Sequence, residues 1–211
     1  KVAILDAHIY GPSMPRLLDI QGRPQTVDGK VMRPMENYGV KVMSMGFLVD
    51  EGTAMIWRGP MVQTALYQML RDVKWADDTN PLDVLVIDMP PGTGDAQLTL
   101  AQKVPVSGAV IVSTPQDIAL IDARKAVEMF RKTEVPVIGL IENMSTHICS
   151  NCGHEEHIFG HGGAEQAAKE LEIPYLGNVP LDIKIRKESD AGFQVPDFFE
   201  EITKKVALNI T

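Results

Sequence analysis

Residues 84–95 read Val84-Leu85-Val86-Ile87-Asp88-Met89-Pro90-Pro91-Gly92-Thr93-Gly94-Asp95. The first four are apolar with no polar alternation, which predicts a strand covered on both faces, as in a parallel sheet. Asp88 closes this strand, at the edge of an open α/β sheet where ligands bind. The glycines that follow let backbone N–H groups approach an anion. The stretch therefore predicts a strand that delivers a carboxylate to an anion-binding loop; a strand followed by a helix capped by Asp95 is the simpler alternative.

The remainder of the chain repeats this alternation of strands and helices. Further apolar strands are expected at 2–6, 108–112 and 137–141, with a brief one near Tyr175. Helical spacing of apolar residues predicts helices at 61–73, 95–104, 163–171 and 182–189, and from Thr114 and Pro196 onward. This order predicts a single α/β domain over 1–211, a doubly wound and mostly parallel sheet flanked by helices. Residues 145–160 form an insertion that contains a Cys-x-x-Cys pair.

Three local features are also predicted. Alternating stretches at 31–35 and 40–45 favour a hairpin. The segment Thr114-Pro115-Gln116-Asp117 is typical of a capping box with proline at the first helical position. The final helix mixes Glu200 and Glu201 with Lys204 and Lys205 on its polar face, so docking on the core is expected rather than membrane binding.

Composition limits the classes of partner. The chain carries a formal net charge of −8, which argues against nucleic acid and against stable association with an anionic membrane. Its 45% hydrophobic content is ample for a core, and no apolar run approaches the roughly 20 residues of a membrane span. Only two cysteines occur, Cys149 and Cys152, which indicates a site in a reducing compartment rather than a disulfide framework.

Two strand-terminal acids are the candidate catalytic residues. Asp6 follows the strand at 2–5 as Asp88 follows the strand at 84–87. In a doubly wound sheet both carboxylates face the same crevice. Paired in this way they resemble the Mg²⁺-binding and water-ordering carboxylates of a nucleoside triphosphatase.

Many ordered motifs along the chain resemble the Mrp/ApbC iron–sulfur carrier ATPases, deviant-Walker P-loop ATPases of the MinD-like superfamily. The resemblance covers nearly the whole chain. The segments that carry it are 6–13, 43–47, 57–60, 88–95, 113–117, 142–145, 149–153 and 157–160.

The resemblance implies a role for each matching residue. Asp88 matches the Walker B acid, Asp6 the acid of the first switch, and Gly92, Thr93 and Gly94 the switch that senses the γ-phosphate. Asn143 matches the asparagine that recognises the base, and Val179-Pro180-Leu181-Asp182 matches the loop that lies against the adenine, which assigns Pro180 and Asp182 to the nucleotide. The implied ligands are ATP, Mg²⁺ and a labile [4Fe–4S] cluster held between two subunits.

The chain departs from the family pattern at two places. His8 stands where the family has a second acid, which is tied to ordering the attacking water. The glycine-rich Walker A loop with its lysines lies upstream in the family, so we expect the chain to be N-terminally truncated relative to a longer functional parent. The strand before that loop is central in the family sheet, so a gap is expected there. ATP hydrolysis is accordingly expected of the full-length family member.

The cysteine pair supports three interpretations. A symmetric dimer would supply Cys149 and Cys152 twice and so complete the four ligands of an iron–sulfur cluster. Alternatively, His154 and His157 complete a Cys₂His₂ zinc site within one chain. A redox dithiol is the third possibility, although such a thiol usually begins a helix and Asn151-Cys152-Gly153-His154 is typical of a loop.

These observations lead to one principal functional hypothesis and two alternatives. The principal one is a homodimeric, ATP-dependent carrier that transfers a [4Fe–4S] cluster to apoproteins, working with assembly factors in the cytoplasm or an organelle matrix. The second is a regulatory ATPase switch of the MinD/ParA type, which would be indifferent to the cysteines. The third is a zinc-stabilised structural protein with a vestigial nucleotide site.

Overall fold

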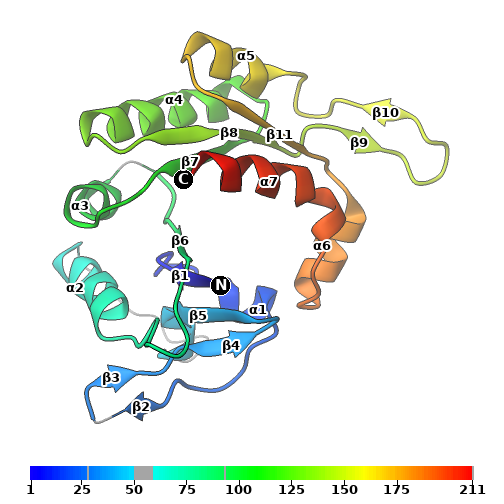
Figure 1. Ribbon diagram of the computed structural model, residues 1–211. Helices are drawn as coiled ribbons and strands as arrows, with labels where there is room; N and C mark the ends of the chain where they lie inside the picture. The colour runs from blue at the N-terminus through cyan, green and yellow to red at the C-terminus, as the bar shows by residue number, and fades with distance from the viewer. Residues whose placement is uncertain (28, 50–58, 93, 211) are drawn as a thin grey trace. The chain divides into compact units, whose positions relative to one another are not determined.

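The computed structural model describes residues 1–27, 29–49, 59–92 and 94–210 (Figure 1). The chain forms two compact units. The first comprises Lys1–Pro91, Asp95–Gln97 and Glu188–Gln194, and the second comprises Gly92–Gly94, Leu98–Lys187 and Val195–Thr211. The single domain expected over 1–211 stays a prediction. Parallel strands flanked by helices in both units confirm the predicted α/β class.

The first unit is organised around a four-stranded sheet in the order β4-β5-β1-β6. Its strands are β4 (Met35–Asn37), β5 (Val40–Ser44), β1 (Val2–Asp6) and β6 (Val84–Asp88). Strand β1 runs parallel to both β5 and β6, and this register places Asp6 beside Ser44 on one side and Asp88 on the other. The two predicted acids therefore end adjacent strands.

Shorter elements surround this sheet. They are α1 (Met14–Leu17), β2 (Thr26–Val27), β3 (Val31–Met32), the 3₁₀ turn η1 (Met45–Phe47) and α2 (Gly59–Arg71). Helix α2 buries Val62, Leu66 and Met69, which share one face as the helical spacing predicts. The predicted hairpin is right in part. Strand β4 pairs antiparallel with β5, but β3 pairs with β2 instead, so the hairpin begins at Met35.

Strand β6 is less buried than its sequence suggests. Its residues are mostly half-buried, and Val86 is 47% exposed. The expectation of a strand covered on both faces is therefore wrong for this chain. The physical reason is that β6 lies at the edge of its sheet, and β7 likewise lies at the edge of the sheet in the second unit. The gap expected from the family pattern stays a prediction.

The second unit contains a three-stranded parallel sheet in the order β11-β8-β7. Its strands are β7 (Ala109–Ser113), β8 (Val137–Asn143) and β11 (Tyr175–Val179). Helices α4 (Asp117–Lys132) and α5 (Gly163–Glu170) cover one face through a cluster that includes Ile111, Leu120, Val127 and Leu140. Helix α7 (Glu200–Asn209) covers the other face, where Ile202 packs with Ile138 and Leu176 (Figure 1). The last helix thus docks on the core as expected.

The remaining elements are α3 (Asp95–Lys103), the short hairpin β9 (His147–Ile148) and β10 (Glu155–Glu156), α6 (Ile183–Asp190) and η2 (Pro196–Phe198). Figure 1 shows the β9–β10 hairpin projecting from the layered part of the second unit. Helix α4 begins at Asp117 with Gln116 as an N-cap that makes no side-chain cap bond. The predicted capping box is therefore wrong, because the Thr114 hydroxyl bonds the Gln116 side chain instead. In the described residues, every helix is too short or too polar to cross a membrane.

Candidate functional site

Asp6 is a fully buried carboxylate whose oxygens are occupied by hydrogen bonds from the protein. Its Oδ1 accepts the His8 N–H at 3.2 Å. Its Oδ2 accepts the N–H groups of Ser13 and Met14, at 3.1 and 3.2 Å, and the Ser44 hydroxyl at 2.8 Å. These four donors converge on one buried side chain, so Asp6 fixes the loop at 7–14 onto the end of β5. The catalytic and first-switch roles expected of Asp6 stay predictions, and its carboxylate oxygens already accept hydrogen bonds from the protein.

Asp88 has the opposite character. It is half-buried, and its backbone carbonyl accepts the Ala7 N–H at 2.9 Å. Burial raises the pKa of the Asp88 carboxyl above its ordinary value, and the neighbouring Asp6 carboxylate raises it further, while His8 acts in the other direction. Ionised Asp88 therefore carries negative charge that its surroundings do not balance. A cation beside this carboxylate would balance its negative charge, so the Asp88 side chain is suited to act as a Mg²⁺ ligand.

Asp88→Asn is expected to raise the free energy of unfolding at neutral pH. The folded-state pKa of Asp88 is raised, so the folded chain holds the proton more tightly and ionisation above that pKa costs stability. Asparagine avoids this cost. The advantage of the variant should therefore disappear as the pH falls through the raised pKa. Urea unfolding midpoints across the acidic range, without Mg²⁺, measure the effect.

The matched control is Asp78→Asn, because Asp78 is an exposed residue of the same unit and the substitution changes the charge equally. It should leave the midpoint nearly unchanged at every pH. A lower midpoint for Asp88→Asn than for the unmodified chain at neutral pH would contradict the electrostatic account.

The loop after β6 is held by a residue that the sequence interpretation did not single out. Gln97 is 5% exposed, and its amide donates to the carbonyls of Pro90 and Pro91 at 3.0 and 2.8 Å. Gly92 has a φ of +94°, which glycine adopts without strain. Gly94 is the N-cap residue of α3. Thr93 lies outside the described residues, so the predicted γ-phosphate switch at Gly92, Thr93 and Gly94 stays a prediction.

The residues predicted to contact the base come together in the second unit. Asn143 ends β8 beside Val179 at the end of β11, so the loop with Pro180 and Asp182 follows directly from that strand. The Asn143 side chain accepts the Met144 N–H at 3.0 Å, and the Asp182 carboxylate accepts the Lys184 N–H at 2.6 Å, just before α6. The structure thus places these predicted residues at one sheet edge. Their roles toward a nucleotide stay predictions.

The two cysteines lie in the turn between β9 and β10. The Cys149 N–H donates to the His154 carbonyl at 2.9 Å, and the Gly153 N–H donates to the Cys149 carbonyl at 2.8 Å. Hydrogen bonds from the backbone N–H groups of Cys152 and Asn151 lower the pKa of the Cys149 thiol, and the Cys152 side chain adds to this effect. Cys152 is exposed. Because the thiolate is the metal ligand, this turn favours metal binding.

The cysteine hairpin is attached at its base to the loop predicted to lie on the adenine. The Leu181 N–H donates to the Thr146 carbonyl at 2.9 Å, and the His147 Nδ1 lies 3.1 Å from the Leu181 carbonyl oxygen. These two contacts span 34 residues or more of sequence, and no sequence pattern would have identified them. They give the two predicted sites a direct physical connection.

The four ligands of the zinc hypothesis do not converge. Over the described ranges, no three His, Cys, Asp or Glu side chains are placed to hold one metal ion. The His154 ring faces Glu156 at 3.9 Å, and the His157 ring pairs with His161. A Cys₂His₂ site within one chain therefore does not form in this arrangement, because both histidines are directed to other partners. One chain offers two thiol ligands.

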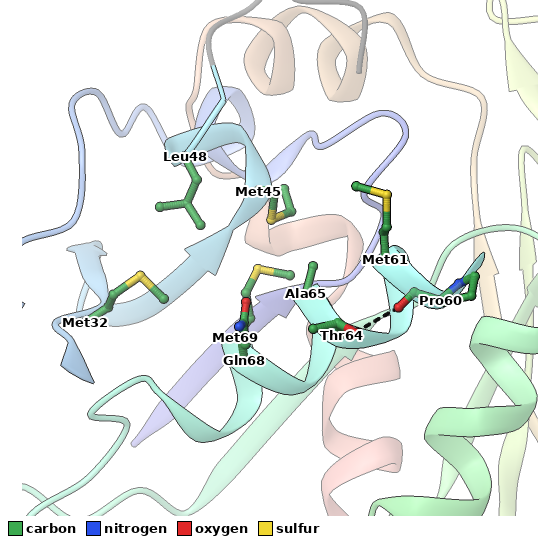
Figure 2. Close-up of a pocket in the computed structure, with 9 residues that line it drawn as sticks. All are labelled: Met32, Met45, Leu48, Pro60, Met61, Thr64, Ala65, Gln68 and Met69. Carbon is green, nitrogen blue, oxygen red and sulfur yellow. Dashed lines mark hydrogen bonds between the residues drawn. The ribbon is translucent and has the colours of Figure 1, made fainter. Parts of the chain in front are cut away.

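A separate cavity of about 420 Å³ lies in the first unit. Figure 2 shows its nine lining residues, four of which are methionines, and a hydrogen bond of 2.9 Å from the Thr64 hydroxyl to the Pro60 carbonyl. Met45 and Met69 are buried core residues, whereas Met61 is 48% exposed. None of the predicted site residues lines this cavity, and core packing accounts for Met45 and Met69.

The fold is that of the α/β P-loop NTPase class. A solved nucleotide-binding protein from Archaeoglobus fulgidus, in complex with ADP, is 37% identical with a TM-score of 0.78, over 95% of this chain and 78% of that chain. The cell-division ATPase MinD from Pyrococcus furiosus shares the fold at 18% identity and a TM-score of 0.65, over 99% of this chain and 86% of that one.

Sequence comparison identifies the family within this class. A family model described as ParA, NUBPL iron-transfer P-loop NTPase, matches residues 1–210. The chain is 58% identical to an iron–sulfur cluster carrier protein of Pseudomonas fragi, over 91% of this chain and 66% of the relative. It is 53% identical to the iron–sulfur cluster transfer protein NUBPL of Mus musculus, over 90% and 59%. The chain belongs to the NUBPL iron-transfer P-loop NTPase family, and it spans about half to two thirds of the length of these curated relatives.

Proposed function

We propose that this chain is the cluster-binding and nucleotide-sensing part of an ATP-dependent carrier that passes a [4Fe–4S] cluster to apoproteins. The observation that carries the proposal is the turn at Cys149 and Cys152, where backbone N–H groups lower the pKa of the Cys149 thiol, in a projecting hairpin. Each chain supplies two ligands and a cluster takes four, so two copies of the hairpin meet across a homodimer. The names of the curated relatives support the same cargo.

The nucleotide side of the carrier uses the two strand-end groups. Asp88 is the residue suited to hold Mg²⁺, and the ion would supply positive charge to stabilise the nucleotide phosphates. Asp6 keeps the loop at 7–14 fixed beside it. Asn143 and the loop with Pro180 and Asp182 receive the base. His8 replaces the second acid of the family pattern, which is tied to ordering the attacking water. The role proposed for this chain's residues is therefore to bind and orient the nucleotide.

The connection at Leu181 suggests how the nucleotide state reaches the cluster. The loop that receives the base shares hydrogen bonds with Thr146 and His147, and the hairpin strand β9 begins at His147. A change in the loop on nucleotide binding therefore repositions the base of the hairpin. Transfer of the cluster is coupled in this way to the nucleotide bound.

Cluster transfer is the direct test. The protein in its full natural length is reconstituted anaerobically with iron and sulfide, then mixed with an apo-dehydratase that needs a [4Fe–4S] cluster, with and without ATP. Recovery of dehydratase activity is expected, together with loss of cluster absorbance from the donor. A donor that keeps its cluster while the acceptor stays inactive would contradict the carrier role.

A regulatory switch is the competing function, favoured by the fold shared with MinD. The switch does not need the thiols, so it predicts nucleotide-driven dimerisation and full cellular function after both cysteines are replaced. The carrier predicts loss of function in the same variant. Partners of the carrier are apoproteins and assembly factors, and a reducing compartment, either cytoplasm or organelle matrix, suits its free thiols.

A further inference from the structure

Two histidines outside the cysteine turn face each other through the same ring atom. The Nδ1 atoms of His157 and His161 lie 3.3 Å apart, the ring centroids are 4.1 Å apart, and the rings are tilted by 56°. Both side chains are exposed. We propose that His157 and His161 form a binding site for a divalent first-row transition ion such as Zn²⁺, one that shares no ligand with the cysteine pair.

The spacing of the two nitrogens matches the bite of such an ion. Zinc binds imidazole nitrogen at about 2.0–2.1 Å, so two nitrogens 3.3 Å apart subtend about 104–111° at the metal. Tetrahedral zinc prefers an angle of about 109°. The existing separation therefore needs no expansion or contraction to accept the ion. Water or another small donor fills the two remaining positions.

Imidazole chemistry also suits this pair to a metal. Two neutral rings that meet through Nδ1 can share only one hydrogen, which one ring donates and the other accepts. A bound ion replaces that single hydrogen bond with two coordinate bonds, and both rings then carry their hydrogen on Nε2. Neutral imidazole is the commonest protein ligand for such ions. The net charge of −8 on the chain further favours the approach of a cation.

A tight turn holds the two rings together. The Gly160 N–H donates to the His157 carbonyl at 3.2 Å, which closes a turn over residues 157–160 and returns the chain so that His161 lies beside His157. Gly160 has a φ of +106°, a conformation that other residues rarely adopt. The turn thus brings the two residues together, and their imidazoles meet beside it.

The segment after the turn is fixed against the start of α4. A Cβ built on Gly163 would lie 2.4 Å from the Pro115 carbonyl oxygen and 2.9 Å from a Leu120 methyl carbon, so only glycine permits this contact. One residue further on, the Ala164 N–H donates to the buried Glu142 carboxylate at 2.9 Å. His161 therefore projects from a backbone that is anchored in the core of the second unit. Such pre-organisation lowers the entropy lost when a ligand binds.

Zinc titration of a thiol-free chain tests the proposal. In the Cys149→Ser/Cys152→Ser background the thiols cannot compete, and isothermal titration with Zn²⁺ is expected to show one ion per chain. His157→Gln and His161→Gln should each weaken binding at least about tenfold, since losing a ligand costs no less than losing the group that orients one. Long-range ¹H–¹⁵N spectra should show both Nδ1 atoms bound to metal.

Two further variants separate this site from general surface binding. His154→Gln removes an exposed histidine of the same loop region that does not belong to the pair, so it should leave the affinity unchanged. Gly160→Ala keeps both imidazoles but strains the turn, so it should weaken binding while the far-ultraviolet circular dichroism stays that of the background. Equal loss with His154→Gln, or full affinity in the His157→Gln/His161→Gln double variant, would overturn the proposal.

Discussion

Alanine at Cys149 or at Cys152 is expected to abolish assembly of the [4Fe–4S] cluster on the full-length protein. In a symmetric dimer each substitution removes two of four ligands at once. Loss of a group that merely orients a metal ligand commonly costs 10–100-fold in affinity, so removal of the ligands themselves should cost more than about a hundredfold. Visible absorbance after anaerobic reconstitution, with iron and sulfide analysis, measures the loss.

The unmodified protein should hold about two iron atoms per chain, because one cluster of four irons serves two chains. Size-exclusion chromatography with light scattering should find the cluster only in dimers. Ser150→Ala is the matched control, since Ser150 lies between the two cysteines and is exposed, so it should assemble a normal amount of cluster. An equal amount of cluster in the Cys149→Ala/Cys152→Ala double variant would show that the ligands lie elsewhere.

Asp6→Ala is expected to be the most destabilising of the single substitutions considered. It removes the acceptor of four hydrogen bonds in a fully buried place and leaves the donors of His8, Ser13, Met14 and Ser44 without their partner. Hydrogen bonds to charged groups contribute about 1.5–3 kcal/mol each and are not additive, so a loss on the order of 4 kcal/mol is expected. Urea unfolding at neutral pH measures the change.

Asp6→Asn distinguishes the loss of hydrogen bonds from the loss of charge. An amide can keep its oxygen toward Ser13, Met14 and Ser44 and turn its NH₂ group toward the single N–H of His8. Only one donor then faces a donor, so a loss of about 1–2 kcal/mol is expected. Asp78→Ala, on the surface, should change stability by less than about 0.5 kcal/mol. Equal stability of Asp6→Ala and Asp78→Ala would mean that the Asp6 network does not hold the unit together.

Local sequence patterns predicted most elements of the fold. Apolar runs gave the strands at Val2–Asp6, Ala109–Ser113 and Val137–Asn143, because unbroken β-branched residues suit buried parallel strands. The exceptions are instructive. Val86 and Val112 have the same sequence signal, yet they are 47% and 59% exposed, and both belong to strands at the edge of a sheet. The order of strands in a sheet decides which strands lie at its edge, and the apolar pattern of a single strand does not reveal that order.

For the candidate site, too, some features follow from the sequence and others depend on the tertiary structure. The sequence by itself determined the identity of the chemical groups: strand-end acids at Asp6 and Asp88, a base-side residue at Asn143 through the family resemblance, and a thiol pair at Cys149 and Cys152. These follow from residue type and short spacing. They do not depend on which distant segments meet.

Only the tertiary structure decided what each group does with its neighbours. It gave Asp6 four donors and left Asp88 with a raised pKa, although both acids end similar strands. It joined His147 to Leu181 and turned His157 toward His161 instead of toward the cysteines. The physical reason is that hydrogen bonds, burial and charge act through space. Residues far apart in the chain therefore set the chemistry of groups whose identity is local.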